Sequence, residues 1–419
     1  MKIKELYELY RKNYLVDTDT RRIRKGTIFF ALKGENFNGN EFALDALENG
    51  ADFCVIDEEK YLVNEKFILV DNVLSTLQKL ANYHRNALNI PIVGLTGSNG
   101  KTTTKELINC VLSSKYRTTA TQGNYNNHIG VPLTLLSMTN ETEIGIVEMG
   151  ANHKGEIKIL AEIAEPSIGY ITNFGKAHLE GFGGEEGVIQ GKSELYRYII
   201  GKGGTLIINP NDSIQIEKSE GGNKYLFSKD VELLEVDPFI RMKLNGSEIK
   251  SNLIGSYNYP NIVAAVTIGN YFDVNQESMI HAIQGYVPTN NRSQIISIGS
   301  NEIILDAYNA NPTSMKAAIE NFKEYGKRRK VVILGDMFEL GNSSEEEHQN
   351  IVDLVEELGF EETIFVGDHF ANSVTLHGKQ FSNFELLSVY LEKTKFENSE
   401  ILIKGSRGMA LERCLEYFN

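Results

Sequence analysis

The segment "GSNGKTTTK" at residues 97–105 places two glycines, a lysine and three threonines together. The apolar run at 92–95 before it predicts a short buried strand, and the residues after it predict a helix. A glycine-rich turn between a strand and a helix offers consecutive backbone N–H groups and a helix N-terminus, which together bind polyphosphate. The segment therefore predicts a phosphate-binding loop.

Lys101 and Thr102 are the side chains of this loop with the most direct chemistry. We expect Lys101, on an exposed turn, to neutralise the β- and γ-phosphates and the Thr102 hydroxyl to bind Mg²⁺. The strict pattern G-x-x-x-x-G-K-[ST] is not met, because Leu95 stands at its first position. An ordinary turn with a surface lysine is the alternative. The residues expected to contact the nucleotide here are Gly97, Ser98, Asn99, Gly100, Lys101, Thr102 and Thr103.

Polar side chains also follow later apolar runs. Glu148 ends "IGIVE", and His178 comes soon after "YITN". Ligands of open parallel sheets bind outside the carboxyl ends of the strands, so both side chains are candidates to hold Mg²⁺ directly or through water. The alternatives are a solvated strand-end charge for Glu148 and a loop or helix-capping histidine for His178.

Two further segments carry candidate groups. Lys192 lies in "VIQGKSELY", where a surface lysine is the default and a lysine with a shifted pKa or a modification is the alternative. The segment "TQGNYNNHIGVPLTLL" at 121–136 places Asn126 and Asn127 ahead of an apolar run. Such dense amides suit a polar, extended ligand, and Asx turns with helix caps are the alternative.

The elements that must position these residues predict an α/β protein of three domains, at 1–85, 86–290 and 291–419. In the first, the strands "GTIFFAL" and "ADFCVID" flank a helix. In the second, "EIGIVEMG", "IGYITNFG" and "GTLIIN" alternate with helical runs, which predicts a mostly parallel sheet like that of P-loop ATPases. In the third, "EIILDAY", "KVVILGDM", "ETIFVGD" and "EILIKGS" predict a second, Rossmann-like doubly wound sheet.

Composition narrows the function classes. The 419 residues carry a net charge of −14, from 42 basic and 56 acidic side chains, which argues against nucleic-acid binding through a broad basic face. No apolar run is long enough to span a bilayer, so we expect no stable membrane insertion. Cys54, Cys110 and Cys414 are too scattered for a disulfide framework or a zinc site, and a cytoplasmic protein is expected.

The order of the motifs resembles the Mur ligases. The resemblance rests on "GSNGKTTTK", "GNYNNHIGVPLTLL", "VEMGANHKGEI" and "ITNFGKAHLEGFG", and on "DTRRIRKGTIFFALKGENFNGNEF", which is similar to that family's N-terminal uridine-nucleotide domain. The later "LDAYNANPTSM", "ILGDMFELG" and "IKGSRGM" point, within the family, to members that join D-alanyl-D-alanine to UDP-N-acetylmuramoyl-tripeptide. The resemblance implies ATP-dependent amide bond formation through an acyl phosphate, in peptidoglycan precursor synthesis. It also implies that the protein is a monomer.

The resemblance also implies roles for single residues. Lys101, Glu148, His178 and Lys192 would be catalytic, and Thr102 would join the last three as ligands of Mg²⁺, with Lys192 carbamylated. The residues implied to contact ATP beyond the phosphate loop are Asn261 at the adenine, and Arg292 and Asp306 toward the ribose and phosphates. Those implied to bind substrate are Asn126, Asn127, Lys404, Ser406 and Arg407.

The chain departs from the family pattern at Tyr257, where histidine is usual, at Asn291, where glycine is usual, and at Ala307, where serine is frequent. Two alternatives stay open from the residues. A folylpolyglutamate synthase uses similar phosphate and magnesium chemistry but gives no reason for the unit at 1–85. A nucleotide-switched binding or transport ATPase would need an aspartate where this chain has Glu148.

Overall fold

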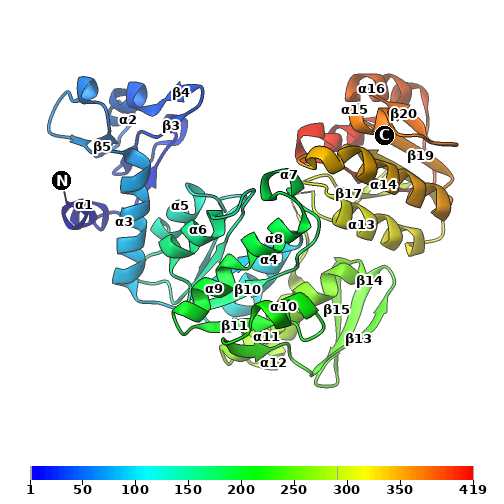
Figure 1. Ribbon diagram of the computed structural model, residues 1–419, viewed down its shortest axis with the longest axis horizontal. Helices are drawn as coiled ribbons and strands as arrows, with labels where there is room; N and C mark the ends of the chain where they lie inside the picture. The colour runs from blue at the N-terminus through cyan, green and yellow to red at the C-terminus, as the bar shows by residue number, and fades with distance from the viewer. Residues whose placement is uncertain (1, 290, 419) are drawn as a thin grey trace.

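The computed structural model describes residues 2–289 and 291–418. The chain is an α/β protein whose main sheets follow one another along the sequence as an N-terminal, a central and a C-terminal unit (Figure 1). The central unit lies between the other two in space as well as in sequence. The expected domain limits at residues 1, 290 and 419 lie outside the described residues.

The N-terminal unit is built on a parallel sheet in the order β1-β2-β5-β6. The predicted strands at "IFF" and "FCVI" are confirmed as its buried middle pair. Its elements are α1 (Ile3–Tyr10), β1 (Val16–Asp17), β2 (Ile28–Phe30), β3 (Lys33–Gly34), β4 (Phe37–Asn38), α2 (Ala43–Glu48), β5 (Phe53–Ile56), β6 (Phe67–Leu69) and α3 (Val73–Leu88).

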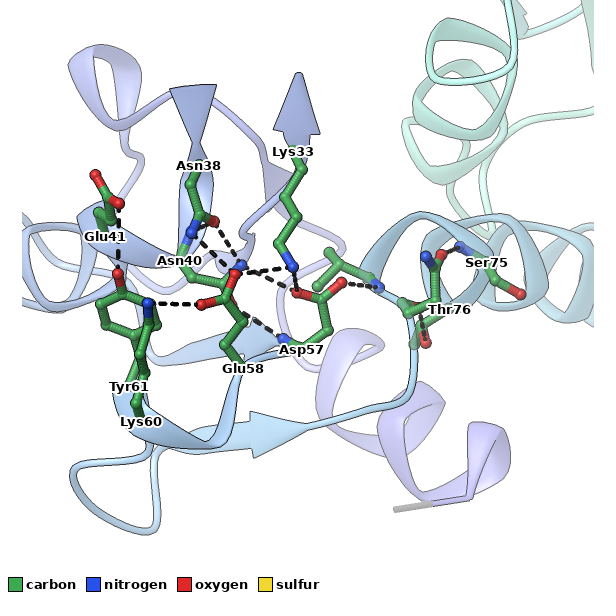
Figure 2. A network of polar contacts seen from close by, with 12 residues as sticks. Lys33, Asn38, Asn40, Glu41, Asp57, Glu58, Lys60, Tyr61, Ser75 and Thr76 are labelled. Atoms are coloured by element: carbon green, nitrogen blue, oxygen red, sulfur yellow. Dashed lines mark hydrogen bonds and ion pairs between the residues drawn. The ribbon is translucent and has the colours of Figure 1, made fainter. Parts of the chain in front are cut away.

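A polar network joins the β3–β4 hairpin to the end of β5 (Figure 2). Lys33 Nζ lies 2.9 Å from both Asp57 Oδ1 and Glu58 Oε1. Asn40 Nδ2 donates to Asp57 Oδ1 at 3.0 Å, and the backbone N–H of Asp57 donates back to Asn40 Oδ1 at 3.0 Å. Asp57 Oδ2 also accepts from the first backbone N–H of α3, at Val73. One carboxylate therefore fixes the hairpin and the start of α3 together.

The central unit contains a parallel sheet in the order β12-β11-β10-β7-β9-β8. Helices α5, α6 and α9 pack on one face, and α4 and α11 pack on the other. The strands are β7 (Ile92–Thr96), β8 (Thr118–Ala120), β9 (Ile144–Glu148), β10 (Ile168–Ile171), β11 (Thr205–Ile208) and β12 (Asn223–Leu226). The helices are α4 (Lys101–Ser113), α5 (Gly130–Leu136), α6 (Glu156–Ala164), α7 (Leu179–Phe182), α8 (Glu185–Lys192), α9 (Glu194–Gly201), α10 (Ser213–Lys218), α11 (Tyr259–Tyr271) and α12 (Gln276–Gly285).

The register of this sheet places the candidate residues side by side. Leu95 of β7 pairs with Glu148 of β9, and Thr96 pairs with Ile171 of β10. The phosphate loop, Glu148 and the loop after β10 therefore leave the same edge of the sheet.

An antiparallel sheet follows, with β13 (Val231–Val236), β14 (Phe239–Leu244) and β15 (Ser247–Ile254) in that order. The edge strands β8 and β12 lack buried apolar residues, so hydrophobic pattern gave no signal for them.

The C-terminal unit has the sheet order β16-β17-β21-β18-β19-β20, parallel except for the β16–β17 pair. The four predicted apolar strands are confirmed as β17, β18, β19 and β21. The strands are β16 (Gln294–Ile298), β17 (Asn301–Asp306), β18 (Arg329–Gly335), β19 (Glu362–Val366), β20 (Lys379–Phe381) and β21 (Ser399–Lys404). The helices are α13 (Pro312–Glu324), α14 (Ser344–Leu358), α15 (Asp368–Ala371) and α16 (Phe384–Lys393).

Helix α3 attaches the N-terminal unit to the central one (Figure 1). It packs against α1 on one side and against α5 and α6 on the other. Tyr10, at the end of α1, is buried and donates its hydroxyl to the backbone oxygen of Leu136 at 2.7 Å. Leu136 is the last residue of α5, so its carbonyl has no partner within that helix. The Tyr10 hydroxyl therefore caps a helix of the next unit.

We expect Tyr10→Phe to lower the free energy of unfolding by about 1–3 kcal/mol, because it leaves a buried carbonyl without a donor. Chemical unfolding followed by circular dichroism measures this change. Tyr83→Phe is the matched control, since that ring lies in the same region but is 36% exposed. Equal effects of the two substitutions would contradict the capping role.

Candidate active site between the central and C-terminal units

A cavity of about 720 Å³ lies between the central and C-terminal units. The phosphate loop, the loop at 124–128 and the segment after β9 form its central-unit side. The C-terminal unit contributes residues from 306–314 and Lys404. The cavity therefore brings together groups that lie some 200 or 300 residues apart in the chain.

The backbone of the phosphate loop is fixed by the segment after β10. Gly97 has a φ of +145°, and a Cβ built on it would lie 1.9 Å from Thr172 Oγ1, so only glycine fits there. Ser98 N donates to Asn173 O at 3.0 Å, and Asn99 N donates to Asn173 Oδ1 at 3.2 Å. The loop leads into α4 through Gly100, which has no side chain to cap the first N–H groups of the helix. Those N–H groups remain available to an anion.

Lys101 is not on an exposed turn, and that expectation was wrong. It is the first residue of α4, and its Nζ folds back to donate to Gly97 O at 2.7 Å and Ser98 O at 3.1 Å. Burial lowers the pKa of Lys101 to about 8; the Glu148 carboxylate opposes this shift, and Arg292 adds to it. The loop thus holds a cation whose partners are backbone carbonyls.

Glu148 is buried, with 1% of its surface exposed, so a solvated strand-end charge is excluded. Its Oε1 accepts from Asn126 Nδ2 at 2.8 Å and from Thr102 Oγ1 at 3.3 Å. Its Oε2 is buried without a hydrogen-bond partner among the described residues. An unpaired carboxylate oxygen beside a hydroxyl offers the hard oxygen ligands that Mg²⁺ prefers.

Within residues 2–289 and 291–418, no three His, Cys, Asp or Glu side chains gather as a metal site. This arrangement fits Mg²⁺, which is usually held by one or two carboxylates together with water and substrate phosphates. His178 lines the same cavity, and its Nδ1 contacts the Glu339 carboxylate of the C-terminal unit. The hydrogen bond with His178 lowers the pKa of Glu339. His178 is therefore tied to a partner that the sequence did not indicate.

Lys192 is fully buried, so the default of a surface lysine was wrong. It is the last residue of α8, and its Nζ donates to Ala151 O at 3.0 Å and lies 4.8 Å from the ring centre of Phe182. It is not among the residues that line the cavity. Burial lowers its pKa well below the ordinary value, and the nearby Lys101 ammonium adds to the shift. The surroundings of this side chain therefore disfavour its charged form.

Arg292 and Asp306 lie on the cavity wall with different partners. The Arg292 guanidinium stacks 3.7 Å from the ring centre of Tyr308, and its Nε is buried without a partner among the described residues. Asp306 accepts from Lys404 Nζ at 2.6 Å and from the backbone N–H of Ser293 at 3.1 Å. Arg292 therefore keeps a buried N–H without a partner among the described residues, and Asp306 is paired with Lys404.

Asn261 and Tyr257 line the cavity from the central unit. Asn261 is buried; its Oδ1 accepts from Thr104 Oγ1 at 3.0 Å, and its amide lies against Gly100. Tyr257 shares a hydrogen bond of 2.9 Å with Ser293 Oγ, and burial raises its pKa. Asn261 is thus placed beneath the phosphate loop.

The Asx-turn alternative is confirmed for Asn127, which also lies in the cavity wall. It lines the cavity, and its Oδ1 accepts from the backbone N–H groups of Ile129 and Gly130 at 3.1 and 2.9 Å. Ser406 and Arg407 are not among the lining residues. Ser406 Oγ accepts from Phe338 N at 2.9 Å, and Arg407 pairs with Glu412 at 2.9 Å on the surface. Of the three expected substrate-binding residues Lys404, Ser406 and Arg407, the structure brings Lys404 alone to the cavity wall.

The contact between Asn99 and Asn311 was missed in the sequence. Asn311 Oδ1 accepts from Ser314 N at 3.0 Å and so caps α13, while its Nδ2 donates to Asn99 Oδ1 at 2.6 Å. An asparagine directly before Pro312 is a helix-start signal, so the cap was readable. Its second bond to the phosphate loop, 212 residues away, was not.

Family models match most of the chain. The models "Mur ligase family, catalytic domain", "Mur ligase middle domain" and "Mur ligase, glutamate ligase domain" match residues 13–92, 95–269 and 291–407. The chain belongs to the Mur ligase family. The resemblance seen in the motifs is therefore confirmed.

Several named relatives and solved structures match almost the whole of this Mur ligase. The UDP-N-acetylmuramoyl-tripeptide–D-alanyl-D-alanine ligase of Bacillus subtilis is 36% identical, over 96% of this chain and 92% of its own. A crystal structure of MurF from Acinetobacter baumannii is 30% identical with a TM-score of 0.85, covering 96% of this chain and 92% of its own. MurF ligase from Thermotoga maritima in complex with ADP is 26% identical with the same TM-score, covering 98% and 97%. The predicted fold class is thus confirmed.

No helix in the described part of this Mur ligase is long and apolar enough to cross a membrane.

We expect the stability of this Mur ligase, relative to its Lys192→Met variant, to rise with pH. The folded pKa of Lys192 lies below the ordinary lysine value of about 10.4, so between the two values the unfolded chain binds the extra proton. The penalty for the buried lysine is therefore full below the folded pKa and disappears above the unfolded one. The slope reaches about 1.4 kcal/mol per pH unit within that window.

Chemical unfolding in carbon dioxide-free buffer at several pH values measures this difference. Lys158→Met is the control, because Lys158 is an exposed residue of α6. A difference between wild type and Lys192→Met that does not change with pH would contradict the assigned pKa shift.

Proposed function

We propose that the chain is an ATP-dependent ligase that joins D-alanyl-D-alanine to UDP-N-acetylmuramoyl-tripeptide in peptidoglycan precursor synthesis. The proposal depends on one observation: a cavity between two units that holds a phosphate loop, the cations Lys101, Arg292 and Lys404, and an unpaired carboxylate oxygen. The identity of the substrates is inferred from relatives that are named UDP-N-acetylmuramoyl-tripeptide–D-alanyl-D-alanine ligase. These relatives are 29–36% identical over almost the whole chain. ADP in the Thermotoga maritima structure supports ATP as the nucleotide.

The reaction proceeds in two displacements. The terminal carboxylate of the tripeptide attacks the γ-phosphorus of ATP, the bond to the β-bridging oxygen breaks, and ADP leaves. The amine of D-alanyl-D-alanine then attacks the acyl phosphate, loses a proton, and expels inorganic phosphate as the amide forms. Lys101 and the N–H groups at the start of α4 stabilise the charge on the transferred phosphoryl group.

Mg²⁺ fits beside the phosphate loop. Thr102 and Glu148 would hold it, with His178 on the same cavity wall and the free Glu148 Oε2 as a ligand. When bound, the ion neutralises phosphate charge and orients the γ-phosphate.

Lys192 is suited to carbamylation. A neutral amine adds to carbon dioxide and releases a proton, which yields a carbamate anion. The lowered pKa of Lys192 favours the neutral amine, and the anion would replace a second ammonium beside Lys101. A carbamate there would offer oxygen ligands to a second Mg²⁺.

The remaining cavity residues bind the two ends of the substrates. Asn261 holds the adenine side of ATP, while Arg292 and Asp306 hold its ribose and phosphates. Asn126 and Asn127 line the path of the muramoyl peptide. Lys404 faces the same cavity, and Ser406 accepts from Phe338 N and so fixes the segment after Lys404, while Arg407 pairs with Glu412 on the surface.

We propose that the protein acts in the cytoplasm as a monomer, as its resemblance to the Mur ligases implies. The folylpolyglutamate synthase alternative gave no reason for the N-terminal unit, whereas a Mur ligase model matches 13–92. The switch ATPase alternative required an aspartate at the end of β9, which carries Glu148 instead.

A coupled assay for ADP release, with product mass by mass spectrometry, tests the function. ADP release should require both UDP-N-acetylmuramoyl-tripeptide and D-alanyl-D-alanine, and the product mass should equal the two substrates minus one water. Tripeptides ending in diaminopimelate and in lysine are compared side by side. ATP hydrolysis that is indifferent to the dipeptide would overturn the assignment.

We expect Lys101→Ala to lower turnover on the order of 10²-fold or more, because a preorganised cation at the transferred phosphate is lost. The fold should persist, since the ammonium bonds only to carbonyls of its own loop among the described residues. Lys202→Ala, on a distant turn of the central unit, is the control. Turnover near that of wild type would show that the loop does not serve the reaction.

We expect ¹³C-labelled bicarbonate to give a carbamate resonance in the wild-type protein that is absent from Lys192→Met. The labile carbamate is best observed by NMR at equilibrium, with Lys158→Met as the control that keeps the signal. A free ammonium at Lys192 in an active, magnesium-loaded complex would disprove carbamylation.

A further inference from the structure

The loop before α7 and the loop after β18 meet across the boundary between the central and C-terminal units. His178 Nδ1 contacts a carboxylate oxygen of Glu339, although the two residues are 161 positions apart. The backbone N–H of Glu180 donates to Glu339 O at 3.2 Å. Gly341, with a φ of +54°, packs so closely that a Cβ on it would lie 3.1 Å from the Glu180 side chain. Backbone and side chains therefore hold this contact together.

Both partners have a constrained backbone. His178 has a φ of +54° and Glu339 a φ of +63°, in the left-handed region that such residues rarely adopt. The conformation aims each side chain at the other. Left-handed backbone at a non-glycine residue persists where the surroundings determine it, and it is enriched at functional sites.

The contact sets which nitrogen of His178 is free. When Nδ1 carries the proton and donates to Glu339, the lone pair lies on Nε2. The ring lines the cavity, and Nε2 has no hydrogen-bond partner among the described residues. Glu339 itself is outside the cavity lining. Glu339 thus contacts His178 from outside the cavity lining, and Nε2 is the ring nitrogen left without a partner among the described residues.

We infer that Glu339 is a positioning residue that fixes the orientation and tautomer of His178, so that docking of the C-terminal unit completes the metal side of the cavity. The inference rests on the proposed function, in which His178 serves Mg²⁺. Histidines that bind metals commonly donate their other ring N–H to a carboxylate, and loss of such a partner typically weakens metal binding 10- to 100-fold. Here the carboxylate comes from a different unit than the other metal-binding groups.

An ion pair across the same boundary provides the control. Lys176 lies two residues before His178 in the chain. Its Nζ is 2.7 Å from Glu347 Oε1. Removing Glu347 weakens docking of the two units without touching the histidine. Glu339→Ala and Glu347→Ala therefore separate positioning from docking, and Glu339→Gln retains an oxygen that can accept from Nδ1.

The experiment reads the His178 tautomer by ¹⁵N NMR in metal-free, substrate-free protein, with His178→Gln to assign the signal. Wild type, Glu347→Ala and Glu339→Gln should show the Nδ1–H tautomer, and Glu339→Ala a mixture. Mn²⁺ affinity in the presence of ADP, measured by electron paramagnetic resonance, should fall about 10- to 100-fold in Glu339→Ala and recover in Glu339→Gln.

An unchanged tautomer and unchanged Mn²⁺ affinity in Glu339→Ala would overturn the inference. Equal losses in Glu339→Ala and Glu347→Ala would also overturn it, because docking alone would then explain them. Failure of the proposed function is distinguishable: wild-type protein would form no amide product, whereas the tautomer is read without metal or substrate.

Discussion

Positive charge withdrawn from water is the constraint on which the cavity depends. Lys101 is satisfied by carbonyls of its own loop, and Arg292 keeps a buried Nε without a described partner. Buried charge is unfavourable unless it is paired. Lys404 pairs with Asp306, whereas Lys101 and Arg292 form no ion pair with a carboxylate among the described residues. Burial lowers the pKa of Lys101, and the phosphates of the proposed nucleotide would supply negative charge beside it.

The same constraint explains why two units meet at this point. The central sheet alone offers the phosphate loop and Glu148 along one edge. The C-terminal unit adds Lys404 and the Asn311 amide, which bonds to Asn99 within the phosphate loop. A reaction through an acyl phosphate needs water kept away, and a cavity built by two units can exclude water when they approach each other. The proposed catalytic site therefore needs both units, because each contributes part of the cavity.

Short sequence patterns predicted the elements that depend on neighbouring residues alone. Buried apolar runs gave the central and C-terminal strands, and glycine, lysine and threonine at fixed spacing gave the phosphate loop. Pattern failed where burial depends on distant packing: Lys192 lies on a short helix with apolar neighbours, and nothing in its spacing shows that its amine faces inward against Phe182. Likewise, the contact of His178 with Glu339 joins loops of different units. Such contacts follow from tertiary geometry, which a single sequence does not reveal.

The central claim is that this cavity joins a phosphoryl group of ATP to a substrate carboxylate. Tripeptide nucleotide labelled with ¹⁸O in its terminal carboxylate tests it most directly, with mass spectrometry of the phosphate released during ligation. The account predicts one ¹⁸O atom in each inorganic phosphate, because the attacking carboxylate oxygen leaves with phosphorus when the amide forms. Amide product accompanied by unlabelled phosphate would contradict it.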